Sequence, residues 1–114
     1  PIVMRTCAYV PQRVGAGASF HGGGLATQQP TSPHLLIPQM KSSMLIAVAQ
    51  NDDETDPQAK VTLRQAFDAA NVPAESEVYP AQHGWCAIDS AVFDQVQAAR
   101  AWARLLHLFE TSLV

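Results

Sequence analysis

Two short segments of the sequence carry side chains that could do acid–base chemistry together. The acidic turn Asn51-Asp52-Asp53 follows a strongly apolar run, and His83 lies in a His-Gly-Trp turn after the next predicted strand. A carboxylate at the end of one strand can orient a histidine at the end of its neighbour, so that the imidazole serves as a general base. The sequence therefore predicts two members of a nucleophile–histidine–acid triad. A nucleophile in a matching turn is not found in the 114 residues.

The two cysteines are poor candidates for that nucleophile. Cys7 lies in a predicted helix among apolar residues and has no flanking glycine, so burial as a small hydrophobic residue is the better interpretation. Cys86 follows His83 in the same turn, where an imidazolium could lower the pKa of its thiol. We favour packing or lining of a substrate cleft for Cys86, and we predict that its neighbour Trp85 contacts substrate in this cleft.

Hydrophobic patterning predicts the elements that must position these residues. Met44 to Ala49 is a nearly continuous apolar run, which is typical of a strand buried on both faces of a parallel sheet. Further strands are predicted at 14–20 and 75–79. Helices are predicted at 2–10, at 57–71 with Asp56 as N-cap, and from 92 onward with an apolar face formed by Val96, Ala99, Ala103 and Leu106.

The order of these elements predicts an α/β fold with a parallel sheet flanked by helices. The sequence shows no internal repeat and no second domain, so residues 1–114 are predicted to belong to one domain. Three strands are few for a doubly wound sheet, which usually carries about five or more. We therefore expect the chain to be the C-terminal half of a larger domain.

Composition and charge exclude several classes of partner. A chain with 47% hydrophobic and 15% charged residues is ordinary for a globular domain. Its net charge of -3 and its 7 dispersed Lys and Arg residues indicate no surface for nucleic acid or an anionic membrane. No apolar run approaches the roughly 20 residues of a membrane span, and no secretory leader is visible. With 2 cysteines and no disulfide framework, the sequence predicts a cytoplasmic protein.

Three motifs, in this order and spacing, make the chain resemble the dienelactone hydrolase family of α/β-hydrolases. They are the run from Arg13 to Leu25, the Gln50-Asn51-Asp52-Asp53 turn and the Tyr79 to Trp85 turn. The resemblance covers essentially the whole chain and implies the C-terminal half of an α/β-hydrolase fold. It also implies that the nucleophile, a cysteine or a serine in a Gly-x-Cys-x-Gly or Gly-x-Ser-x-Gly elbow, lies upstream of residue 1.

The resemblance assigns roles to residues at matching positions. His83 matches the general base, and Asp52 or Asp53 matches the acid that orients its ring. Strand register favours Asp52, whereas the Asp-x-x-x-Pro spacing of many family members, met here by Asp53 and Pro57, favours Asp53. We prefer Asp52. The acidic turn lacks the glycine and the closing glutamate of an EF-hand, so we predict no metal site there.

The run His21-Gly22-Gly23-Gly24 looks like the oxyanion-hole motif of lipases and esterases. That motif belongs before the nucleophile, however, and here it follows the predicted elbow helix and a strand. A tight turn beside the cleft is therefore the better interpretation of the glycines. We predict that His21 contacts the substrate.

The resemblance implies a hydrolase that cleaves a small ester or lactone through an acyl-enzyme, without a metal or an organic cofactor. Dienelactone itself is disfavoured, because Ala87 stands where members acting on it carry an arginine for the substrate carboxylate. The alternative is a non-catalytic truncated relative that associates through its exposed sheet edge, as a homo-oligomer or with a separate N-terminal half. A flavodoxin-like binding module is less favoured, because no phosphate-binding glycine pattern opens a helix.

Overall fold

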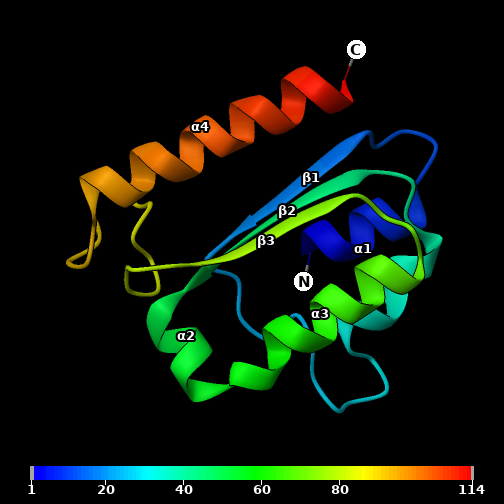
Figure 1. Cartoon of the computed structure of the whole chain (residues 1–114), viewed down its shortest axis with the longest axis horizontal. Helices are drawn as coiled ribbons and strands as arrows, with labels where there is room; N and C mark the ends of the chain where they lie inside the picture. Colours follow the sequence, from blue (N-terminus) through cyan, green and yellow to red (C-terminus); the bar gives the residue numbers. More distant parts are fainter. Residues whose placement is uncertain (1, 114) are drawn as a thin grey trace.

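A parallel sheet of three strands forms the middle layer of the protein (Figure 1). The computed structural model describes residues 2–113. The strands are β1 (Ala16–Phe20), β2 (Ser43–Ala49) and β3 (Ala74–Tyr79), in the order β1-β2-β3. The predicted α/β class with a parallel sheet is therefore confirmed.

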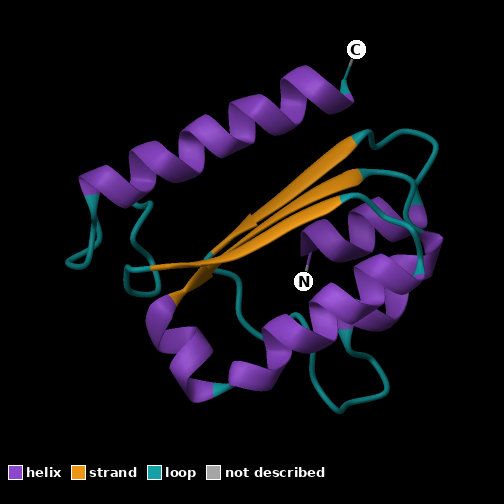
Figure 2. Ribbon diagram, viewed as in Figure 1, coloured by secondary structure: helices purple, strands orange, loops and turns teal. Residues whose placement is uncertain are grey.

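Helices cover both faces of this sheet. The long helix α4 (Gln95–Ser112) lies along one face, and α1 (Ile2–Tyr9) and α3 (Pro57–Ala69) lie on the other (Figure 2). The 3-10 helix η1 (Pro33–Gln39) packs against α1 and α3. The short helix α2 (Gln50–Thr55) follows β2 without a loop.

The strand register brings three chain segments together at one end of the sheet. Phe20 at the end of β1 pairs with Ala47 of β2, and Ala49 at the end of β2 pairs with Tyr79 at the end of β3. Because all strands are parallel, their carboxyl ends lie at the same edge. The residues after β1, the helix α2 and the turn after β3 therefore begin side by side.

Residues of β2 alternate between two hydrophobic cores. Met44 and Ile46 belong to the core formed with α1, η1 and α3, whereas Ala47 and Ala49 belong to the core on the α4 side. Burial on both faces explains why the strand is a continuous apolar run. The second core also contains Tyr79 and Trp85, so it extends to the turn that carries His83.

The buried face of α4 differs from the predicted one. The buried residues of this helix are Ala101 and Leu108, whereas Val96 is 73% exposed. The helix carries apolar residues on two faces: Ala101 and Leu108 are buried, whereas Val96, Trp102 and Leu106 are exposed. An apolar pattern with two candidate faces cannot show which one packs on the sheet. Beside the buried face, Arg104 donates from Nε to Glu75 Oε2 of β3 at 2.9 Å and Arg100 pairs with Glu77 of the same strand.

Several predicted boundaries also shift. The strand predicted at 14–20 begins at Ala16, and the acidic turn is the first part of α2. Asp56 occupies the N-cap position of α3, but its side chain makes no capping hydrogen bond. The last helix begins at Gln95 rather than 92, because Asp94 caps it by accepting a hydrogen bond from the Gln97 N–H at 3.0 Å. A side-chain acceptor at the N-cap satisfies an N–H that the first helical turn leaves free.

We predict that Gly17→Ala destabilises the fold. A Cβ at Gly17 would lie 2.7 Å from Cys7 Sγ and 3.1 Å from Met44 Sδ, so α1 and β1 could not keep their present spacing. The expected loss in the free energy of unfolding is about 1–3 kcal/mol, measured by urea denaturation. Gly23→Ala is the matched control, because a Cβ there would meet nothing within 4 Å. Equal stability of the two variants would contradict the close approach of α1 to β1.

Candidate active site

The start of α2 holds the acidic residues at the carboxyl end of β2. Ala49 stands at the N-cap position, and the Gln50 N–H donates to the carbonyl of Ala81 at 2.8 Å. This bond ties α2 to the loop that follows β3. Asp52 and Asp53 lie in the first turn of α2, where partial positive charge from free backbone N–H groups stabilises carboxylates.

His83 is held to α2 by two contacts. Its backbone N–H donates to Asn51 Oδ1 at 2.8 Å, and its ring Nδ1 lies 2.6 Å from Asp52 Oδ2. A carboxylate accepts only, so Nδ1 is the protonated nitrogen in this contact and Nε2 is left as the basic one. The His83 side chain is 52% exposed, and a substrate can therefore reach it.

Asp53 takes a different partner from its neighbour. Its Oδ1 lies 2.7 Å from Lys60 Nζ of α3, and it makes no contact with His83 among the interactions described. Successive residues of an α-helix point about 100° apart, so Asp52 and Asp53 cannot both face the same histidine. The structure brings Asp52 to His83 and Asp53 to Lys60.

His21 lies beside His83 at the end of β1. Its ring centroid is 5.4 Å from that of His83 at an interplanar angle of 61°, and 5.2 Å from that of Trp85 at 71°. Burial lowers the pKa of His21, and the nearby His83 lowers it further. The neutral form of His21 is therefore favoured.

Trp85 lies beneath these histidines. It is fully buried and stacks on Tyr79 of β3 with ring centroids 5.2 Å apart. The guanidinium of Arg100, on α4, lies 4.1 Å from the Tyr79 ring centroid. Because Trp85 is fully buried, a substrate could touch it only if the neighbouring side chains moved away. Trp85 thus forms the inner wall of the site.

Cys86 lies in the same turn and is partly buried. Burial raises the pKa of its thiol, so the thiolate is disfavoured at neutral pH. Cys7 is buried between α1 and β1. Neither cysteine is paired in a disulfide.

A cavity of ≈ 170 Å³ adjoins the acidic side of the site. The glycine run after His21, Val48 at the end of β2, and residues of α2 and α3 line it, among them Asp52, Asp53 and Lys60. The motif residues Gly22, Gly23 and Gly24 therefore form one wall of this cavity, while the Asp53–Lys60 pair forms part of another.

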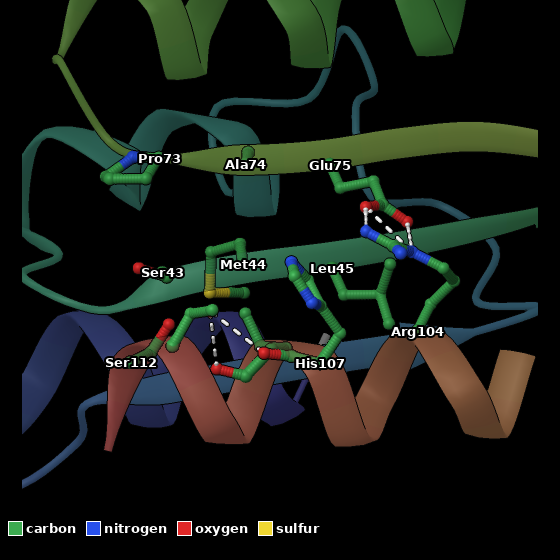
Figure 3. A pocket seen from close by; sticks show the side chains of 11 residues that line it. Ser43, Met44, Leu45, Pro73, Ala74, Glu75, Arg104, His107 and Ser112 are labelled. Carbon is green, nitrogen blue, oxygen red and sulfur yellow. Dashed lines mark hydrogen bonds and ion pairs between the residues drawn. The ribbon is translucent and has the colours of Figure 1, made fainter. Parts of the chain in front are cut away.

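A second cavity lies at the opposite end of the sheet (Figure 3). Its volume is ≈ 210 Å³, and the first residues of β2 and β3 line it together with the end of α4. Arg104 and Glu75 form an ion pair in its wall, with His107 nearby, and the hydrogen bond from Arg104 lowers the pKa of Glu75. Asp52 and His83 follow the other ends of these strands, so this cavity is separate from the candidate site.

Two general properties hold for residues 2–113. No group of three or more His, Cys, Asp and Glu side chains there could hold a metal ion. No helix within the same range is long and apolar enough to cross a membrane.

Sequence reasoning named Asp52, His83, His21, Trp85 and Cys86, and the structure gathers all five at the carboxyl end of the sheet. It missed the supporting roles of Asn51 and Lys60. Asn51 could have been suspected from its place in the same turn as Asp52. The Lys60 contact had no sequence signal, because Asp53 and Lys60 meet only through the angle between α2 and α3.

Comparison with known proteins gives a consistent family assignment. Residues 1–113 match the model of the dienelactone hydrolase family. The chain is similar to a protein of known crystal structure, a "Putative Dienelactone Hydrolase" from Klebsiella pneumoniae subsp. pneumoniae MGH 78578. The two share 27% sequence identity, and their structures superpose with a TM-score of 0.82. The alignment covers 96% of this chain and 47% of that protein, so the chain spans about half the length of this relative. No curated protein matched the chain.

Proposed function

The chain belongs to the dienelactone hydrolase family, and we propose that it supplies the base and the acid of a hydrolase that cleaves a carboxylic ester or lactone. The observation that carries this proposal is the contact of 2.6 Å between His83 Nδ1 and Asp52 Oδ2 at the carboxyl end of the sheet. In this proposal the α/β-hydrolase domain extends beyond residues 1–114. Its nucleophile, a cysteine or a serine, belongs to that further part.

His83 moves the protons in the proposed reaction. Its Nε2 takes the proton of the nucleophile as the nucleophile attacks the carbonyl carbon, and then gives that proton to the departing alkoxide oxygen. An acyl-enzyme results. Water then attacks the acyl carbon while His83 accepts its proton, and collapse of the intermediate returns this proton to the nucleophile and releases the carboxylic acid.

Asp52 acts on the imidazole rather than on the substrate. It accepts the Nδ1–H hydrogen bond, which selects the tautomer with a basic Nε2 and stabilises the imidazolium that forms during each proton transfer. The Asn51 contact with the His83 N–H holds the backbone beside this pair. Asp53 is engaged by Lys60 and takes no part in the proposed chemistry.

The proposed substrate is a small ester or lactone that enters beside His21 and Cys86, with Trp85 as the inner wall. Ala87 offers no charge for a substrate carboxylate. A neutral acyl group is therefore favoured over the dienelactone carboxylate. We place the reaction in the cytoplasm, where the unpaired Cys7 and Cys86 would stay reduced.

Trapping of the acyl-enzyme tests this proposal. The full-length protein that contains this chain is mixed with p-nitrophenyl acetate, and we expect release of p-nitrophenolate with a rapid first turnover. Intact-mass and peptide analysis should locate the acetyl group on a cysteine or serine outside residues 1–114. An acetyl group on Cys86, or no ester cleavage at all, would overturn the assignment.

A second candidate is association of a non-catalytic chain through its sheet edge. Within residues 2–113, β1 pairs with β2 alone, and exposed apolar residues such as Trp102 and Phe109 line the outer face of α4. Unpaired strand edges and apolar surface favour association. Size-exclusion chromatography with light scattering separates the candidates, because a catalytically inactive oligomer supports the second and an active monomer rejects it.

A further inference from the structure

We propose that His21 is a positioning residue for His83, and that its ring holds the imidazole of His83 in the orientation that faces Asp52. This inference rests on the proposed function of His83 as general base. It assigns His21 a role through His83, in addition to any contact with substrate.

The backbone of His21 is held in an unusual conformation. Its φ angle is 45°, in the left-handed region that residues with a Cβ rarely adopt. Its N–H donates to the Ala47 carbonyl at 2.8 Å, which continues the pairing of β1 with β2. A Cβ at Gly22 would lie 2.3 Å from Ser19 Oγ, so a larger residue there would displace the Ser19 side chain. Such conformations persist where surrounding contacts enforce them, and they concentrate at functional sites.

The ring of His21 packs between two other rings, those of Trp85 and His83. It meets Trp85 edge to face at 5.2 Å, and Trp85 is fully buried and stacked on Tyr79. Arg100 lies against the Tyr79 ring at 4.1 Å. The stack is therefore anchored in the core between the sheet and α4.

His83 needs such support because its own side chain is half exposed. Within residues 2–113 its ring makes one hydrogen bond, from Nδ1 to Asp52, and rotation about its two side-chain torsions would break it. The edge of His21 at a centroid distance of 5.4 Å restricts that rotation. The orientation of the His83 ring decides whether Nε2 points at the nucleophile, and small displacements of a reacting group lower the reaction rate strongly.

The charge state of His21 fits this role. The titratable groups that act on it are His83, from the turn after β3, and Asp52, from α2. Burial and His83 lower the pKa of His21, and these effects exceed the opposing influence of its backbone hydrogen bond and of Asp52. A neutral His21 does not repel the imidazolium that forms on His83 during each proton transfer.

Two variants of the full-length protein separate the ring of His21 from its backbone. His21→Asn removes the ring but keeps a residue that tolerates the left-handed region, whereas His21→Phe keeps a flat ring without a titratable group. Because phenylalanine adopts this region at a cost, the melting temperature of each variant is measured beside its kcat. With p-nitrophenyl acetate, His21→Asn should lower kcat about 10-fold to 100-fold with KM changed by less than about 2-fold. His21→Phe should recover most of the lost kcat.

The pH profile of kcat/KM tests whether His21 acts on His83 through its ring or through a charge. Loss of a positive charge beside His83 would raise the pKa of its imidazole and shift the acid limb to higher pH. We expect the acid limb of His21→Phe to coincide with that of the wild type, because the lowered pKa of His21 favours its neutral ring. A clear upward shift would contradict a neutral His21.

Other outcomes overturn the inference in distinct ways. A raised KM with unchanged kcat in His21→Asn would mean that His21 binds substrate only. Equal losses of kcat in both variants would mean that ring packing is not the cause, and a loss that tracks the unfolded fraction would mean a structural role. Should His83→Ala keep wild-type turnover, the proposed function itself fails. A dead His83→Ala with a normal His21→Asn rejects the positioning role alone.

Discussion

His83→Ala is expected to lower kcat of the full-length protein for p-nitrophenyl acetate by about 10⁴-fold or more. The variant loses the group that accepts the proton of the nucleophile and returns it to the leaving group. Binding of the ester depends on other surfaces, so KM should change far less than kcat. The measurement is the initial rate of p-nitrophenolate release over a range of ester concentrations.

His107→Ala is the matched control for this variant. His107 is also a histidine, but it lies on α4 and lines the cavity at the opposite end of the sheet. Its removal should leave kcat within about 2-fold of the wild type, in line with the small effects of surface substitutions away from a site. Wild-type turnover in His83→Ala, or a comparable loss in His107→Ala, would reject His83 as the general base.

Asp52→Asn is expected to lower kcat by about 10³-fold to 10⁴-fold while the fold is retained. The amide has the shape of the carboxylate, but it carries no charge to stabilise the imidazolium. Its NH₂ group can also donate to Nδ1, which would place the ring proton on Nε2 and remove the basic nitrogen from the site. The loss should appear in kcat at all pH values where the wild type is active.

Asp53→Asn provides the control for Asp52→Asn within the same turn of α2. It removes the ion pair with Lys60 but leaves the His83 contact in place. We expect kcat within a few-fold of the wild type and a modest loss of stability of about 1 kcal/mol at most, because the lysine is partly exposed. If Asp53→Asn were the damaging variant and Asp52→Asn were active, the triad acid would be Asp53.

The two variants also separate catalysis from folding. Both should show similar melting temperatures by circular dichroism, since each replaces a carboxylate with an amide of equal size. A large difference in activity at similar stability would then report the chemistry of the His83 ring. A parallel loss of structure in Asp52→Asn would instead indicate that the Asp52–His83 contact holds α2 in place.

The sequence by itself determined the order of the strands and of the helices α1, α3 and α4, and it determined the family. The apolar run around Met44 to Ala49 predicted the central strand, because burial on both faces leaves a local signature that needs no partner to be recognised. The turns that carry Asp52 and His83 could also be recognised from local sequence. Each lies directly after a strand, and parallel strands must deliver their carboxyl ends to one edge.

Only the tertiary structure decided which side chains meet at that edge. Asp52 and Asp53 are neighbours with the same chemistry, and it is the start of α2 at Gln50 that turns one towards His83 and the other towards Lys60. The buried face of α4 was missed because the helix carries apolar residues on two faces, and only its packing on the sheet shows which one is buried. The contact of His21 with His83 joins the ends of β1 and β3, which are not adjacent in the sheet. Such contacts depend on the relative placement of distant segments, and no local pattern in the chain encodes that placement.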